Sequence, residues 1–166
     1  MKACFIGHKT IEKTEELIAS LRETITALIR KGVTTFLFGS MSEFDKLSWE
    51  IVTEIQHTHP YIKRVYVRAN YEYIEASYEK YLLQLYEETY FPKKIENAGK
   101  YSYIERNYEM IDRSTYCIFY YNENYVALSQ QKSKHSLFTV RRSGTKTSYQ
   151  YAIQKGKVII NLYTPK

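Results

Sequence analysis

The sequence has no apolar run close to the roughly 20 residues that a membrane-spanning helix needs. Its first ten residues, MKACFIGHKT, hold a short apolar core without a small-residue cleavage site, so we expect no signal peptide. Cysteine is scarce too, because only Cys4 and Cys117 are present and each lies in an apolar, strand-like run. We therefore expect buried free thiols in a cytoplasmic protein rather than a disulfide framework.

Several well-known motifs are also missing. The four histidines and two cysteines lack metal-ligand spacing, although His57 and His59 lie close together, so we expect neither a metal nor a cofactor. No G-x-x-x-x-G-K Walker A loop, no G-x-G-x-x-G dinucleotide fingerprint and no G-x-S-x-G nucleophile elbow occurs. Internal repeats and low-complexity tracts are absent as well.

The composition is that of a soluble globular protein, with 44% apolar and 25% charged residues. A length of 166 residues suits one domain, which we expect to cover residues 1–166. The net charge of +6 favours anionic partners, but the basic residues are dispersed apart from positions 93–94 and a cluster at 132–142. Tyrosine is abundant, with 18 residues. Some of them must lie on the surface, where a ring can pack flat or stack on a base.

Strand-like and helix-like signals alternate along the chain, which predicts an α/β fold with a mostly parallel sheet. The expected strands cover residues 2–6, 34–38, 62–67, 115–121 and 158–162, and the expected helices cover residues 12–31, 43–57, 74–90, 103–111 and 145–155. A long polar connection over residues 122–142 precedes the last helix. We therefore predict a single Rossmann-like, three-layer domain with about five strands.

Polar residues and glycines follow the first two expected strands, where open α/β sheets bind their ligands. Gly7, His8 and Lys9 follow the first strand. The histidine can bond a phosphate, a ribose or a backbone carbonyl, although a lone histidine there is more often structural. Gly39 and Ser40 follow the second strand in the same way.

Two carboxylate and guanidinium positions have alternative roles. Asp45, in the first turns of the second helix, either accepts bonds from ribose hydroxyls or complements the helix dipole. Arg106 and Asn107 lie on the helix before the fourth strand. There the arginine either holds a phosphate or pairs with Asp112, which leads into that strand.

The segment around Ser143, Gly144 and Thr145 is a candidate phosphate-binding loop. Glycine lets the backbone approach an anion, hydroxyls donate hydrogen bonds, and the first turn of the following helix favours negative charge. Arg142 can add a charge-assisted hydrogen bond. The alternative is that Ser143 only caps the helix.

Four segments together resemble the SLOG superfamily, a Rossmann-like group that includes LOG-type phosphoribohydrolases and the single-strand DNA-binding DprA/Smf proteins. They are CFIGHK, FGSMSEFDKLSWEIV, RNYEMIDRSTYCIFYYNENY and SGTKTSYQYAIQKGKVIINL. The match to its YpsA-like branch, formerly a domain of unknown function, runs nearly end to end. It implies a nucleotide-type ligand over the strand ends, with a pocket lined by Gly7, His8, Gly39, Ser40, Asp45, Ser143, Gly144 and Thr145. Arg106 and Asn107 match a motif of the branch.

The chain departs from the LOG hydrolases at their P-G-G-x-G-T-x-x-E loop, whose glutamate serves catalysis. Here Lys146, Thr147 and Ser148 follow Gly144 and Thr145, so that acid is absent. The second strand also ends in Gly-Ser-Met-Ser rather than the Gly-Gly pair common in the superfamily. The resemblance therefore implies binding more than turnover.

Three functions follow from these observations. The main hypothesis is that the chain binds an ADP-ribose-like molecule, a cyclic nucleotide or a nucleoside phosphate, as a sensor or sequestering protein in bacterial antiviral signalling or its phage counter-defence. The alternatives are a nucleotide N-glycosidase, which needs a carboxylate at the scissile bond, and single-stranded DNA binding. Because no continuous basic-aromatic stripe is evident, the sequence argues against nucleic acid as a partner. Self-association through the tyrosine-rich middle is a further hypothesis.

Overall fold

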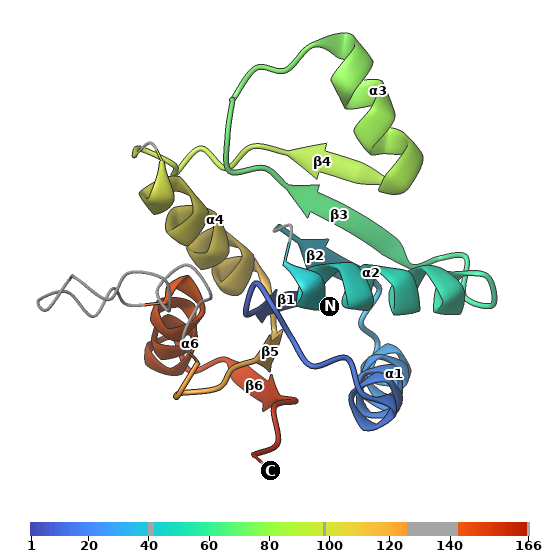
Figure 1. Ribbon diagram of the computed structural model, residues 1–166. Helices are drawn as coiled ribbons and strands as arrows, with labels where there is room; N and C mark the ends of the chain where they lie inside the picture. Colours follow the sequence, from blue (N-terminus) through green and yellow to red (C-terminus); the bar gives the residue numbers. More distant parts are fainter. Residues whose placement is uncertain (40–41, 98, 126–142, 166) are drawn as a thin grey trace, which may run out of the picture.

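The computed structural model describes residues 1–39, 42–97, 99–125 and 143–165, and a parallel sheet of six strands lies at its centre (Figure 1). The strands are β1 (Lys2–Gly7), β2 (Thr35–Phe38), β3 (Lys63–Val67), β4 (Glu88–Tyr90), β5 (Tyr116–Tyr120) and β6 (Val158–Asn161), in the order β4-β3-β2-β1-β5-β6. The helices are α1 (Glu15–Arg30), α2 (Glu43–Gln56), α3 (Ala76–Leu85), α4 (Lys100–Arg113) and α6 (Gly144–Gln154). The predicted α/β class and the Rossmann-like arrangement are confirmed.

Two apolar layers lie on the two faces of this sheet, because successive residues of a strand point to opposite sides. In β1, Phe5 packs into the layer of α1 and α2, whereas Cys4 and Ile6 pack into the layer of α4 and α6. The first two helices therefore cover one face and the last two cover the other (Figure 1). Helix α3 stands apart from them at the β4 edge of the sheet.

Helix α1 shows how local chemistry sets the boundaries. The side chain of Thr14 accepts a hydrogen bond from the backbone N–H of Leu17 at 3.2 Å and so caps the helix, which begins at Glu15 rather than at the expected position 12. Its buried residues recur every three or four positions: Leu17, Leu21, Ile25, Leu28 and Ile29. Gly32 follows with a φ of 89°, a conformation that glycine adopts without strain.

The prediction of one helix over residues 74–90 is wrong. The structure divides this segment into α3 and the short strand β4, which pairs with β3 and raises the number of strands from about five to six. The guanidinium of Arg64 holds the carboxylate of Glu87 at 2.6 Å, directly before β4. A strand of three residues is too short for a visible alternation, and the contact that fixes it joins distant residues.

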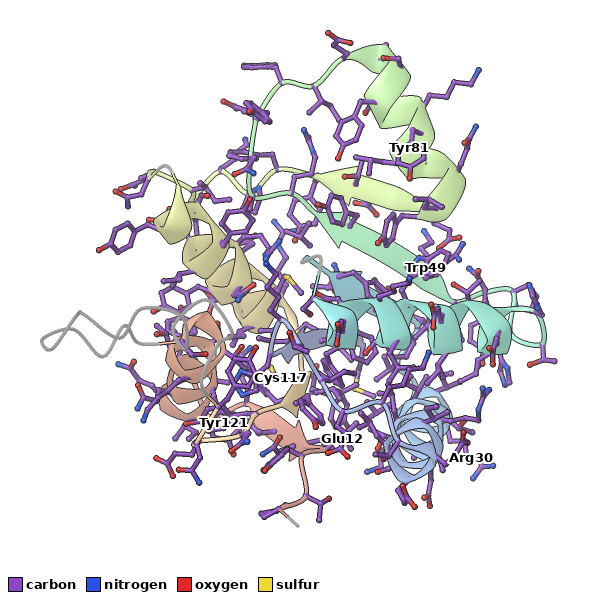
Figure 2. The ribbon with its side chains drawn as sticks, viewed as in Figure 1. Glu12, Arg30, Trp49, Tyr81, Cys117 and Tyr121 are labelled. Atoms are coloured by element: carbon purple, nitrogen blue, oxygen red, sulfur yellow. The ribbon has the colours of Figure 1, made fainter. Side chains whose placement is uncertain are left out.

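The two cysteines are free and buried, as expected. Cys4 and Cys117 are register partners on β1 and β5, and Figure 2 labels Cys117 in the interior of the molecule. Burial raises the pKa of the Cys4 thiol well above its ordinary value, so this thiol stays protonated and unreactive.

Some predictions lie outside the described residues, namely Ser40, Arg142 and most of the polar connection before α6. In the ranges that the structure does describe, no helix combines the length and the apolar character needed to cross a membrane.

Candidate functional site

The strand order changes direction at β1. Strands β2 to β4 follow on one side of it and β5 and β6 on the other, so the carboxyl ends of β1 and β5 form the topological switch point where open α/β sheets bind ligands. Gly7, His8 and Thr145 meet there. The Thr145 hydroxyl donates to the carbonyl oxygen of Gly7 at 3.0 Å, and the ring of His8 stacks on Tyr125 with a centroid separation of 3.9 Å. At the ends of β1 and β5, the Thr145 hydroxyl and the His8 ring are therefore engaged in contacts within the protein.

His8 is 2% exposed, and its Nε2 accepts a hydrogen bond from the backbone N–H of Asn122 at 2.9 Å. The same Nε2 also lies 3.1 Å from the carbonyl oxygen of Asn122, to which it donates in the other tautomer, and Nδ1 is buried without a hydrogen-bond partner among the described residues. Burial lowers the pKa of His8 to about 4, and the backbone of Asn122 opposes this shift only in part. The histidine is therefore neutral at physiological pH and is not a cation for a phosphate.

The start of α6 has the geometry of an ordinary capped helix. Ser143 accepts a hydrogen bond from the backbone N–H of Lys146 at 3.5 Å, and its carbonyl accepts from the Thr147 hydroxyl at 3.3 Å. A side-chain carbon at Gly144 would meet no atom of the described residues within 4 Å. The structure thus shows the capping role of Ser143, while phosphate binding by this loop stays a prediction.

Gly39, Asp45 and Arg106 form a second group, at the carboxyl end of β2. A side-chain carbon at Gly39 would lie 2.6 Å from Cδ of Arg106, so the strand end packs directly on α4. Asp45 is buried in the first turn of α2, and its backbone N–H donates to Ser42 at 3.1 Å. Lys9 is exposed, and its carbonyl accepts from the backbone N–H of Glu43 at 2.9 Å.

Arg106 is 1% exposed, so its charge lies inside the protein. Its Nε donates to the side-chain oxygen of Asn107 at 2.9 Å, and Asn107 in turn donates to Ser148 on α6 at 3.0 Å. Burial lowers the pKa of Arg106, and the charge of Asp45 opposes the shift. Among the described residues no ion pair joins Arg106 to Asp112, which instead accepts from the Tyr151 hydroxyl at 3.1 Å.

Beside this group lies a pocket of about 550 Å³ that the sequence did not predict. We call it the tyrosine pocket, because its lining includes Tyr66, Tyr71, Tyr73, Tyr78 and Tyr103. These rings come from β3, the β3–α3 loop, α3 and α4. Gly39 and Arg68 also line the pocket, which therefore opens at the carboxyl ends of β2 and β3.

The side chain of Arg68 binds the backbone of the loop between β3 and α3. Its Nη1 donates to the carbonyl oxygens of Tyr71 and Glu72 at 3.0 and 3.2 Å. Tyr71 has a φ of 60°, the left-handed conformation that residues other than glycine rarely adopt. Asn70 donates to the Tyr103 hydroxyl at 2.7 Å and so ties the loop to α4.

The high tyrosine content was the available signal for this pocket, but the pattern along the chain could not locate it. Its tyrosines stand at irregular spacing between positions 66 and 103 and converge only through the fold. Among the described residues, no group of three or more histidines, cysteines or carboxylates is placed to hold a metal ion. The pocket therefore provides aromatic rings for stacking and the guanidinium group of Arg68.

No family model and no curated protein matches the chain. Among solved structures, it is similar to DNA processing protein A from Helicobacter pylori, which has a single-stranded DNA binding mode; the TM-score is 0.59 and the identity 15%. The match covers 96% of this chain and 63% of the other, so this chain spans less than two thirds of that protein. This likeness shows the fold alone. It is consistent with the SLOG resemblance, while the YpsA-like branch stays a prediction.

The argument against nucleic acid as a partner is wrong, because a protein with this fold binds single-stranded DNA. The argument required a continuous basic-aromatic stripe in the sequence. In the structure, tyrosines that are scattered along the chain line one pocket together with Arg68, so rings gather on the fold without a stripe in the sequence.

Proposed function

We propose that the chain binds single-stranded nucleic acid at the carboxyl ends of its strands, with bases stacking on the rings of the tyrosine pocket. The observation that carries this proposal is the gathering of five tyrosines around one opening. Proteins that bind single strands combine aromatic platforms with positive charge, because every base has a face that stacks and every nucleotide carries a phosphate.

The exposure of the tyrosines supports this function. Tyr73 is 86% exposed although it lines the pocket, so its ring lies at the mouth, where a base can reach it. When a base covers such a ring, apolar surface of both partners leaves contact with water, and this stabilises the complex.

Positive charge near the pocket complements the tyrosines. Arg68 lines it, and the buried guanidinium of Arg106 lies behind Gly39, close to the ring of Tyr103 at 5.6 Å. The carboxylate of Glu75 also lines the pocket and offsets the charge of Arg68, and Arg106 is buried, so the net charge of +6 is what favours a polyanion over a neutral ligand. Binding should therefore weaken steeply as the salt concentration rises.

The test is fluorescence anisotropy with a labelled oligothymidylate of about 12 nucleotides, a length within the site sizes of known single-strand-binding domains. We expect salt-dependent binding of this strand and weaker binding of the matched duplex. Tyr73→Ala should reduce the affinity about 5-fold or more. Tyr61→Ala is the control, because Tyr61 is also exposed but precedes the amino end of β3. Equal affinity for single strand and duplex would contradict the proposal.

A second candidate is a nucleotide-derived small molecule, such as ADP-ribose, a cyclic nucleotide or a nucleoside phosphate. The size of the pocket favours it, since about 550 Å³ lies within the range of roughly 300–1,000 Å³ typical of small-molecule sites. Mass spectrometry of compounds released from heat-denatured protein tests it directly. A co-purified nucleotide that competes with the oligonucleotide would favour this candidate; its absence, with no calorimetric heat from adenine nucleotides, would exclude it.

A further inference from the structure

We propose that the tyrosine pocket takes one nucleobase at a time, which leaves the stack of its own strand and enters between Tyr66, Tyr78 and Tyr103. The inference rests on the proposed function and narrows it. A flat platform would stack successive bases along the surface, whereas the rings of this pocket come from three separate elements, β3, α3 and α4, and a base enters among them.

The walls of the pocket are fixed before a ligand arrives. The ring of Tyr66 stacks on Tyr86 with centroids 5.2 Å apart, which holds it against the sheet. On the opposite side, the Tyr103 hydroxyl accepts from Asn70 at 2.7 Å, and the Arg106 guanidinium lies near its ring. Rings that are already oriented lose little conformational freedom when a base enters between them.

The backbone around the opening is held in a strained form. Tyr71 keeps its left-handed φ because Arg68 binds the carbonyls of Tyr71 and Glu72. Residues outside glycine persist in this conformation only where the surroundings fix them, and such residues cluster at ligand-binding sites. Here the strained turn keeps the β3–α3 loop over the pocket.

One residue of the lining, Arg68, has a polar atom without a hydrogen-bond partner among the described residues. This atom, Nε, is buried. An unsatisfied buried donor is unfavourable, and a carbonyl oxygen or ring nitrogen on the edge of a base accepts from it once the Arg68 side chain turns toward the ligand. A strand of phosphates and sugars without bases has no aromatic ring that could stack on the tyrosines.

The experiment compares the labelled oligothymidylate with an abasic strand of the same length, which keeps every phosphate and removes every base. Wild-type protein should bind the abasic strand at least about tenfold more weakly, because stacking is lost. Equal binding of the two strands would overturn the single-base pocket and leave phosphate-driven binding intact. If neither strand binds, the proposed function itself fails, and the inference fails with it.

Two variants on α3 separate the pocket from general stacking on the surface. Tyr78 lines the pocket and is 46% exposed, whereas Tyr81, one turn later and labelled in Figure 2, is 54% exposed and lies outside the lining. Tyr78→Leu should weaken binding of oligothymidylate about 5- to 100-fold and leave abasic binding unchanged. Tyr81→Leu removes the ring that stacks on Tyr78 with centroids 6.3 Å apart but leaves the lining complete, so it should weaken oligothymidylate binding less than Tyr78→Leu does and leave abasic binding unchanged. If the two variants behave alike while circular dichroism shows both folded, the base does not enter the pocket.

Discussion

Replacement of Gly7 by alanine tests the close packing of the carboxyl end of β1 on helix α2. The added carbon would lie 2.5 Å from Cβ of Phe44, whereas carbon atoms in contact stay about 3.5–4.0 Å apart. Phe44 is fully buried and its Cβ is attached to the backbone of α2, so the clash cannot be relieved by a rotation of the side chain. The helix must move by about 1 Å or the strand end must shift.

Overpacking of this kind in a buried core costs about 1–3 kcal/mol. We expect Gly7→Ala to lie near the upper end, because two rings, Phe5 and Tyr120, pack on Phe44 and resist its displacement. Urea unfolding followed by the fluorescence of the single tryptophan, Trp49, measures the free energy of unfolding. With a slope of about 2 kcal/mol per molar urea, the midpoint should fall by about 1.5 M.

Gly144→Ala is the matched control for this experiment. The added carbon meets nothing within 4 Å in the part of the chain that the structure describes, and alanine favours a helix over glycine. This variant should be as stable as the wild type or more stable by up to about 1 kcal/mol. If Gly7→Ala unfolds at the same urea concentration as Gly144→Ala, the close approach of β1 to α2 is wrong.

Three further results are expected. The pKa of His8 in the folded chain is about 4 instead of its ordinary 6.5, so the unfolded chain binds more protons between these two pH values and the free energy of unfolding should fall as the pH drops from 6.5 to 4. Chemical denaturation at several pH values measures this dependence, which His8→Gln should flatten. The same pH dependence in the variant and the wild type would contradict the buried neutral ring. Arg64→Met leaves the Glu87 carboxylate without its guanidinium and should cost about 1–3 kcal/mol, with faster amide exchange in β4; unaltered exchange there would show that the ion pair does not anchor the strand. Cys4 and Cys117 should react with a thiol reagent only after unfolding, and rapid modification of the native protein would show that the sheet is open at its centre.

The elements with strong local signals could be predicted from the sequence. Helix α1 has a threonine cap, apolar residues at helical spacing and a glycine at its end, all within one segment. Strands β1 and β5 are continuous apolar runs, as buried parallel strands usually are. The placement of Gly7 and His8 at the carboxyl end of the first strand follows from these local features, with Gly7 as the last residue of β1 and His8 directly after it.

What could not be predicted depends on contacts between distant residues. Strand β4 is three residues long and is fixed by Arg64, which lies 23 residues before Glu87. The open alternatives for Arg106 needed the packing of α4 on Gly39, which no spacing reveals. The tyrosine pocket likewise needed the positions of four separate elements.

The most direct test of the proposed function is hydrogen–deuterium exchange of the protein with and without saturating oligothymidylate. A strand bound at the tyrosine pocket should slow exchange in residues 68–78 and in the first turns of α4, which carry Arg68, Tyr71, Tyr73, Tyr78 and Tyr103. Exchange around Tyr61, at the other edge of the sheet, should stay the same. Slower exchange confined to the start of α6, or no change anywhere in residues 68–78, would contradict binding at this pocket.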